Sequence, residues 1–122
     1  MDYIPSNLTV LIKEQRKIKK PFPPPVRKVL VFQLFKALYY MSLTNLCHRD
    51  LKPPNILINP QTFEVKICDF GSAKIFDKAE SNVAYICSRY YRAPELVMQA
   101  TDYHTEIDVW SIGCIMVELL TL

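Results

Sequence analysis

Glycine is almost missing from this sequence, which has only Gly71 and Gly113 among its 122 residues. Loops that wrap phosphate groups with backbone amides are usually rich in glycine, because glycine adopts backbone conformations that other residues avoid. The two glycines are too far apart to share one loop. The sequence therefore contains no glycine-rich phosphate-binding loop.

Closely spaced cysteines are also missing. The four cysteines, Cys47, Cys68, Cys87 and Cys114, never lie within a few residues of one another. Zinc sites and small disulfide-stabilised domains usually need such close pairs. We therefore expect reduced thiols, in a cytoplasmic or nuclear protein.

A long apolar run and a strong net charge are missing as well. No run of roughly 18 apolar residues is present, so we expect no membrane span. The net charge of +3 is too small to predict nucleic-acid binding. Basic residues gather between Lys13 and Lys20, and we interpret that stretch as a solvated helix face and linker.

The order of apolar residues and prolines predicts four helices and one β-hairpin. Helices are expected at residues 8–20, 26–43, 93–98 and 105–120, and strands at residues 56–58 and 65–68. Three consecutive prolines separate the first helix from the second, because proline lacks the backbone N–H group that a helix interior needs. The last of them, Pro25, fits the first turn of the second helix. The apolar residues of the 69–93 segment follow neither the helical nor the strand period, which predicts a long loop. Loops of this length are usually functional or disordered.

Two of these helices are apolar on most sides. Between residues 29 and 41 the strongly polar positions are Gln33 and Lys36, which form one narrow exposed stripe with Tyr40. The last helix is similar, and we expect its Trp110 to lie in the core. Helices of this kind are normally enclosed by other helices. In a chain this short we expect them to expose apolar surface, which a partner could cover.

The stretch "HRDLKPPN" at residues 48–55 has the side chains that phosphoryl transfer needs. Transfer depends on positioning, a divalent metal and positive charge near the moving group. Asp50 can take the proton of an acceptor hydroxyl, and Lys52 can face the moving phosphate. Asn55 and Asp69 can offer oxygen atoms to Mg²⁺, because Mg²⁺ prefers hard oxygen ligands.

Three motifs follow one another: "HRDLKPPN", "DFG" at residues 69–71 and "APE" at residues 93–95. In this order they resemble the signature motifs of eukaryotic protein kinases. The stretches "CDFGSAK", "YICSRYYRAPEL" and "ATDYHTEIDVWSIGC" are similar to the glycogen synthase kinase-3 (shaggy) group of the CMGC kinases. The opening "DYIP" resembles the hinge of that group, and the similarity covers essentially all 122 residues.

The resemblance implies an α+β fold of the protein-kinase type, with a mainly α-helical C-lobe and a short β-hairpin. Residues 1–122 would form a partial kinase domain that contains the hinge, catalytic loop, activation segment and buried helix. The N-lobe and the C-terminal helices are expected to be absent. We therefore expect these residues to be inactive alone.

The resemblance also implies ATP and Mg²⁺ as cofactors. The backbones of Asp2 and Ile4 would bind adenine, and Leu57 would form the floor of its pocket. Asp50 and Lys52 would be catalytic. Asn55 and Asp69 would hold Mg²⁺ and, through it, the nucleotide.

Further matching positions concern phosphate groups on proteins. Tyr85 matches the tyrosine that is phosphorylated in the activation segment, and Arg89 and Arg92 would hold its phosphate through their guanidinium groups. Arg49 and Lys74 match two of the three basic residues that bind a substrate already primed by phosphorylation. Protein substrates are thus the expected partners, and neither nucleic acid nor a membrane is expected.

Three other matches are structural. His48 would pack under the catalytic loop and bond its backbone, and Asp108 would anchor the same loop from inside the last helix. Glu95 would lack its usual partner, so we expect it to be solvent-exposed or disordered.

The sequence leaves three hypotheses. The first is a serine/threonine kinase of the glycogen synthase kinase-3 type, and the second is a truncated, non-catalytic kinase lobe that acts by binding. The third is a cyclin-dependent or mitogen-activated kinase. The absence of a Thr-x-Tyr motif disfavours a mitogen-activated kinase, and "SRYYRAPE" favours the shaggy group.

Overall fold

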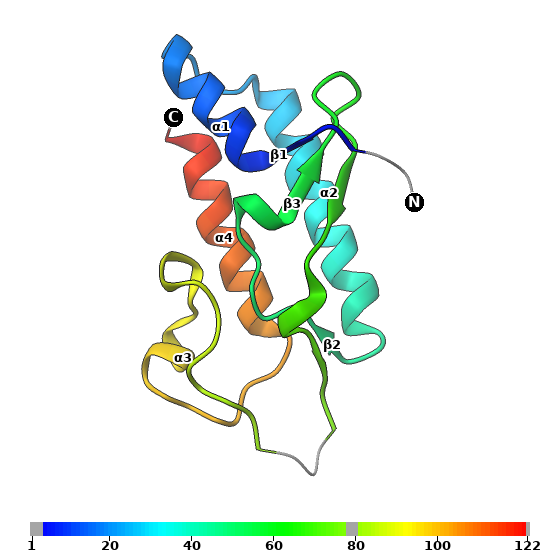
Figure 1. The fold of residues 1–122 in the computed structure, drawn as a ribbon, viewed down its shortest axis with the longest axis vertical. Coiled ribbons are helices and arrows are strands. Elements are labelled where there is room, and N and C mark those ends of the chain that lie inside the picture. The colour runs from blue at the N-terminus through cyan, green and yellow to red at the C-terminus, as the bar shows by residue number, and fades with distance from the viewer. Residues whose placement is uncertain (1–3, 78–80, 122) are drawn as a thin grey trace.

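The computed structural model describes residues 4–77 and 81–121. Figure 1 shows two long helices, α2 (Pro24–Ser42) and α4 (Glu106–Leu120), that lie side by side and run in opposite directions. The shorter α1 (Leu8–Ile18) lies beside the end of α4, and α3 (Pro94–Val97) is a single turn. The four predicted helices are therefore present, although the first ends at Ile18 rather than at residue 20.

Short strands form two small sheets in the described residues. The strands are β1 (Ser6–Asn7), β2 (Leu46–Cys47), β3 (Ile56–Ile58), β4 (Val65–Ile67) and β5 (Lys74–Ile75). The first sheet has the order β1-β3-β4 and the second pairs β2 with β5, and all pairs are antiparallel. The predicted hairpin is the β3–β4 pair. The sequence did not indicate β1, β2 or β5, because each has only two residues.

Local signals explain where the helices begin and end. The Asn7 side chain accepts a hydrogen bond from the Val10 amide at 3.1 Å and caps α1. Lys19 ends that helix in the left-handed conformation, with φ of 51°. Pro24 and Pro25 occupy the first turn of α2, where a missing amide costs nothing.

One main core holds these elements together. It lies between α1, α2, α4 and the inner face of β3, which contributes Ile56 and Ile58. A second, smaller core surrounds Phe76 and Tyr103 beneath α3. No helix in the described ranges is both long and apolar enough to cross a membrane.

Gln33 corrects part of the predicted exposed stripe on α2. Its amide group donates to the Phe63 carbonyl at 2.8 Å and accepts from the Val65 amide at 3.0 Å. The side chain is half-buried and ties the β3–β4 hairpin to the helix. The polar residue Gln33 in this apolar helix therefore forms hydrogen bonds with the hairpin rather than with solvent.

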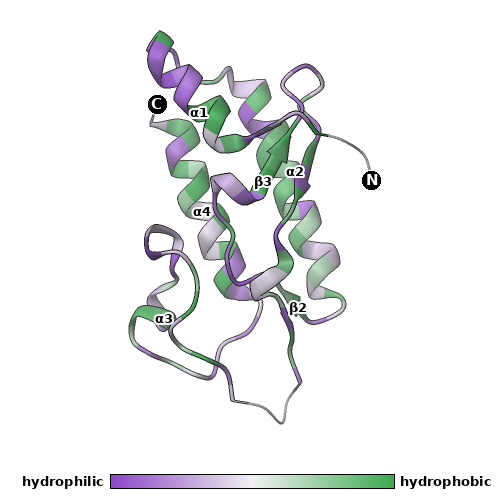
Figure 2. Ribbon diagram, in the orientation of Figure 1, coloured by the Kyte–Doolittle hydropathy of each residue, from purple (hydrophilic) through white to green (hydrophobic). Residues whose placement is uncertain are grey.

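The outer faces of α2 and α4 expose large apolar side chains, as the sequence predicted for this chain. Figure 2 shows that hydrophobic residues occur along both helices. On α2 only Leu30, Leu34 and Leu38 are buried, whereas Phe32 is 67% exposed. The prediction that Trp110 is a core residue is wrong, because it is 49% exposed on α4.

Glu95 also departs from its prediction. It is half-buried and helical in α3, rather than exposed or disordered. It lines, together with Trp110, a hollow of about 620 Å³ on the outer face of α4.

Candidate active site

The loop at residues 47–55 is anchored from inside α4. The buried Asp108 carboxylate accepts hydrogen bonds from the backbone amides of His48 at 2.7 Å and Arg49 at 3.0 Å. Burial raises the pKa of Asp108, and these two amides partly oppose the rise because they favour the charged form. Arg49 adopts the left-handed conformation, with φ of 66°. The predicted anchoring role of Asp108 is confirmed.

His48 is fully buried and connects two loops. Its Nε2 lies 2.9 Å from the Cys68 carbonyl, and the Asp50 amide donates to its Nδ1 at 3.3 Å. Because Nδ1 accepts from the Asp50 amide, Nε2 is the ring nitrogen placed to donate to the Cys68 carbonyl. Both ring nitrogens are thus occupied by backbone groups, which confirms the predicted structural role.

The Asp50 carboxylate is held by two neighbouring side chains. Lys52 Nζ lies 2.6 Å from its Oδ2, and the Ser88 amide and hydroxyl donate to its Oδ1 at 3.1 and 2.7 Å. Burial alone would raise the pKa of Asp50, but the hydrogen bonds from Lys52 and Ser88 outweigh it, so the pKa lies below its ordinary value. Asp50 is therefore a charged acceptor at neutral pH, aimed at a hydroxyl.

Ser88 is the site residue that sequence reasoning missed. Its hydroxyl donates to Asp50 and lies 3.1 Å from Lys52 Nζ, so it joins the two predicted catalytic side chains. Ser88 sits in the long loop between β5 and α3, 36 residues after Lys52. A serine in a segment without periodicity gives no signal of such a contact.

The hairpin brings the two predicted metal ligands to neighbouring places. Asn55 precedes β3, and its carbonyl accepts from the amide of Cys68, the residue before Asp69. The Asn55 amide nitrogen donates to the Asp50 carbonyl at 2.9 Å, which leaves the amide oxygen as the atom able to bind a cation. Asp69 is exposed and offers its carboxylate.

This donor set fits Mg²⁺. Among the described residues there is no cluster of three or more His, Cys, Asp or Glu side chains that could enclose a metal. Magnesium usually takes one or two protein carboxylate ligands and completes its shell with water and phosphate oxygens. Two hard oxygens at the edge of a hairpin match that requirement.

The backbone turns sharply at Asp69 rather than at Gly71. Asp69 is left-handed with φ of 60°, and Gly71 has no positive φ. A Cβ atom on Gly71 would lie 3.2 Å from Asp69 Oδ1, which is tighter than ordinary contact. Glycine at 71 therefore leaves room for the Asp69 carboxylate.

The predicted adenine-binding residues are partly placed. Leu57 is half-buried on β3 and points to the face opposite the buried Ile56 and Ile58, because side chains alternate along a strand. Ile4 is half-buried just before β1, which pairs with β3. Asp2 lies outside the described residues.

Arg49 and Lys74 lie on segments that are joined through the second sheet. Lys74 is paired with Cys47 in the β2–β5 register. The Arg49 Nε donates to the Ser72 carbonyl at 2.7 Å, two residues before Lys74. The small second sheet therefore brings the two segments that carry these basic residues close to each other.

Tyr85 and its two arginines are placed differently from one another. Tyr85 is 85% exposed, and the Arg92 guanidinium carbon lies 4.8 Å from the centre of its ring. Arg92 also donates to the carbonyls of Ile86 and Cys87, whereas Arg89 is exposed. Arg92 thus contacts the ring face of Tyr85 and not its hydroxyl.

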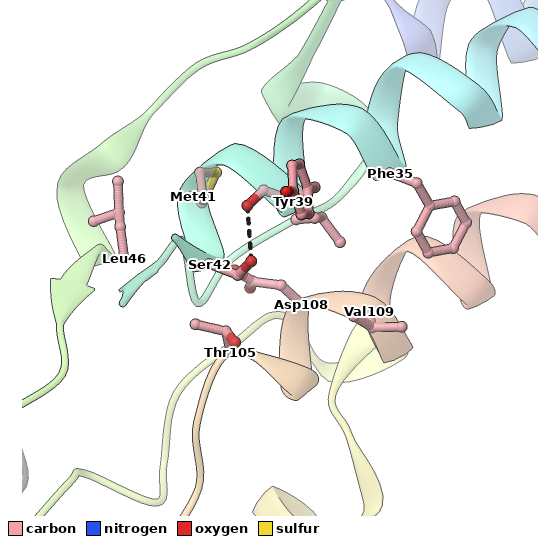
Figure 3. Close-up of a pocket in the computed structure, with 9 residues that line it drawn as sticks. Phe35, Tyr39, Met41, Ser42, Leu46, Thr105, Asp108 and Val109 are labelled. Atoms are coloured by element: carbon pink, nitrogen blue, oxygen red, sulfur yellow. Dashed lines mark hydrogen bonds between the residues drawn. The ribbon is translucent and has the colours of Figure 1, made fainter. Parts of the chain in front are cut away.

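An apolar cavity of about 230 Å³ lies between the end of α2 and the start of α4 (Figure 3). Phe35, Tyr39 and Val109 line it, with Asp108 at its edge. None of the residues predicted to transfer phosphate lines this cavity. Through Asp108 the cavity borders the anchor of the 47–55 loop, and it is not part of the candidate active site.

Comparison with known families agrees with this geometry. The family model of the protein kinase domain matches residues 1–122, the whole of the sequence. The α+β arrangement of four helices and small antiparallel sheets in the described residues is that of a kinase-type C-lobe. The 47–55 loop contains the His-Arg-Asp motif of this family, and Asp69 begins its Asp-Phe-Gly motif. The chain belongs to the protein kinase domain family.

Proposed function

We propose that this protein transfers the γ-phosphoryl group of ATP to serine or threonine hydroxyls of protein substrates. One observation carries the proposal. The Asp50–Lys52 pair holds the hydroxyl of a serine, Ser88, at 2.7 Å from the carboxylate and 3.1 Å from the lysine nitrogen. A pair that accommodates this alcohol has the right spacing for the alcohol of a substrate.

Asp50 has the role of the base. In the transfer, an acceptor hydroxyl oxygen forms a bond to the γ-phosphorus, the bond from that phosphorus to the ADP oxygen breaks, and Asp50 takes the hydroxyl proton. Lys52 neutralises charge on the moving group. Asn55 and Asp69 would hold Mg²⁺, which supplies positive charge between the phosphates.

The finer assignment is to the glycogen synthase kinase-3 group. It is supported by the sequence motifs and by the neighbouring positions of Arg49 and Lys74, which suit the phosphate of a primed substrate. The exposed Tyr85 suits a phosphorylation site. Its phosphate would engage Arg89 directly, and Arg92 only after its guanidinium left the ring.

A second candidate is a non-catalytic kinase lobe that acts by binding a partner. Two observations favour it: the 122 residues contain no glycine-rich loop, and the outer faces of α2 and α4 expose apolar side chains such as Phe32 and Trp110. Exposed apolar patches of this kind mark partner surfaces. On this reading the chain would bind without transferring phosphate.

The test compares the 122-residue protein with the same residues joined to a kinase N-lobe that supplies a glycine-rich loop. Both are given radiolabelled ATP with Mg²⁺ and peptides that differ only in a serine, threonine or tyrosine acceptor. Because residues 1–122 are expected to be inactive alone, we expect label on the serine and threonine peptides only from the joined protein. Asp50→Asn should lower the rate about 10²- to 10⁴-fold, the usual contribution of a catalytic base, while circular dichroism stays unchanged.

Calorimetry of ATP and Mg²⁺ binding separates the two candidates. Nucleotide binding together with transfer that depends on Asp50 supports the kinase. Absence of both from the joined protein supports the non-catalytic lobe, and transfer that survives Asp50→Asn contradicts the assigned base.

A further inference from the structure

A cavity of about 290 Å³ lies between α1, the 47–55 loop, the η3 turn (Arg89–Tyr91) and the end of α4. Lys52 and Ser88 both line it. These are the two side chains that hydrogen-bond the Asp50 carboxylate. The cavity is therefore adjacent to the place proposed for the acceptor hydroxyl, on the side covered by α1.

The lining of this cavity carries excess positive charge. Lys13, Arg16 and Lys52 line it, against the single acid Glu118. Glu118 already accepts a hydrogen bond from the Tyr91 hydroxyl and lies 3.7 Å from Arg16. Lys52 is paired with Asp50. Among the described residues Lys13 has no ion-pair or hydrogen-bond partner, so its charge is uncompensated.

Thr9 provides an independent observation in the same cavity. It lines the cavity from the first turn of α1, and its hydroxyl oxygen is buried without a hydrogen-bond partner among the described residues. Buried polar atoms in folded proteins almost always have partners. A hydroxyl beside two cations is a suitable additional donor for an anionic group.

We propose that this cavity binds an anionic side chain of the protein substrate, close to the phosphorylated serine or threonine. Lys13 and Arg16 of α1 are the residues that select it, and Thr9 adds a hydrogen bond. The site differs from the Arg49–Lys74 region, whose residues lie on the β2–β5 side of the loop. Its role in substrate choice rests on the proposed kinase function, whereas the binding itself does not.

Peptide binding tests the inference without requiring catalysis. Three sets of fluorescent peptides share one serine acceptor and carry glutamine, glutamate or phosphoserine, respectively, at one neighbouring position after another. Fluorescence anisotropy with the 122-residue protein should show about tenfold tighter binding of one glutamate peptide than of its glutamine twin, as expected for a charge-assisted contact. The phosphoserine arm distinguishes a carboxylate-selective cavity from a phosphate-selective one, and the difference should shrink at high salt.

Matched charge reversals on α1 locate the contact. Lys13→Glu should remove the preference for the anionic peptides, because Lys13 lines the cavity and has no other partner among the described residues. Lys17→Glu makes the same charge change one turn later, at an exposed residue that does not line the cavity. It should retain most of the preference. Both lysines are exposed, so circular dichroism should show that both variants fold.

Equal affinities for the glutamine and anionic peptides would overturn the inference, as would equal losses in the two variants, which would indicate only a general attraction to basic α1. A preference that depends on Lys13, without phosphate transfer to any peptide by the protein joined to an N-lobe, would sink the kinase proposal and leave the binding site standing. Phosphate transfer with the same kcat/KM for the glutamine, glutamate and phosphoserine peptides would leave the kinase proposal standing and overturn the role of this cavity in substrate choice.

Discussion

The 47–55 loop and the 81–93 segment meet at the same carboxylate but are built in opposite ways. In the 47–55 loop, His48 and Leu51 are completely buried, and Asn55 is nearly so. In the 81–93 segment the aromatic side chains of Tyr85 and Tyr90 are 85% and 83% exposed. The 47–55 loop is held by buried side chains, whereas the 81–93 segment presents two of its tyrosines to solvent.

The difference follows from where each region finds its hydrogen bonds. The 47–55 loop is bonded to α4 through Asp108 and to the 68–69 segment through His48. Much of the 81–93 segment bonds to itself, as Arg92 does to Ile86 and Cys87. The 47–55 loop is thus bonded to the core, whereas much of the 81–93 segment is bonded to itself.

The largest expected effect comes from removing the anchor of the buried region. Asp108→Ala leaves two buried backbone amides without an acceptor, and each unsatisfied amide costs about 1 to 3 kcal/mol. We therefore expect the free energy of unfolding to fall by roughly 2 to 4 kcal/mol, together with the order of the Asp50 site. Urea unfolding followed by circular dichroism measures this loss.

Asp102→Ala is the matched control, because Asp102 is exposed just before α4. It should change the unfolding free energy by less than about 0.5 kcal/mol. Asp108→Asn keeps one acceptor oxygen and should fall between the two. Similar losses for Asp102→Ala and Asp108→Ala would mean that the 47–55 loop does not depend on its buried anchor.

The sequence predicted local elements and motif positions better than it predicted contacts between distant segments. Helices α2 and α4 and the β3–β4 hairpin follow from apolar period, proline and turn residues, which are local signals. Asp50, Lys52, Asn55 and Asp69 were found through motif order. The contact of Ser88 with Asp50 was not found, because it joins residues 38 apart in the chain through a segment without period.

The local sequence pattern also failed to predict the solvent exposure of individual side chains. Trp110 was expected in the core from its chemistry, yet it is half-exposed on the outer face of α4. Gln33 was expected in solvent from its polarity, yet it bonds the hairpin. In both cases burial depends on which element lies opposite, and the sequence of the helix does not contain that information.

A smaller effect is expected where the two regions touch. Ser88→Ala removes the hydroxyl that donates to Asp50, which should raise the pKa of Asp50 and cost about 1 to 2 kcal/mol of stability near neutral pH. The folded-state pKa of Asp50 lies below its ordinary value of 3.8. Its stabilising contribution is therefore complete above that value and is lost as the pH falls through the lowered pKa.

Urea unfolding of the wild type and Ser88→Ala across acidic and neutral pH tests the sign. The difference between the two should be largest above pH 3.8 and should shrink as the pH falls through the lowered pKa. Ser81→Ala, at an exposed serine of the same segment, should show no such pH dependence. A gap that widens with acid would contradict the proposed contact.

The smallest effect is expected at the tip of the exposed region. Tyr85 contacts Arg92 through its ring, and an exposed cation–π contact contributes about 0.5 to 1 kcal/mol. Tyr85→Ala should therefore lower the unfolding free energy by no more than about 1 kcal/mol, and Tyr85→Phe by almost nothing, because the ring remains. A loss as large as that of Asp108→Ala would erase the contrast between the two regions, since Tyr85 would then be part of the structural support rather than an exposed side chain with one ring contact.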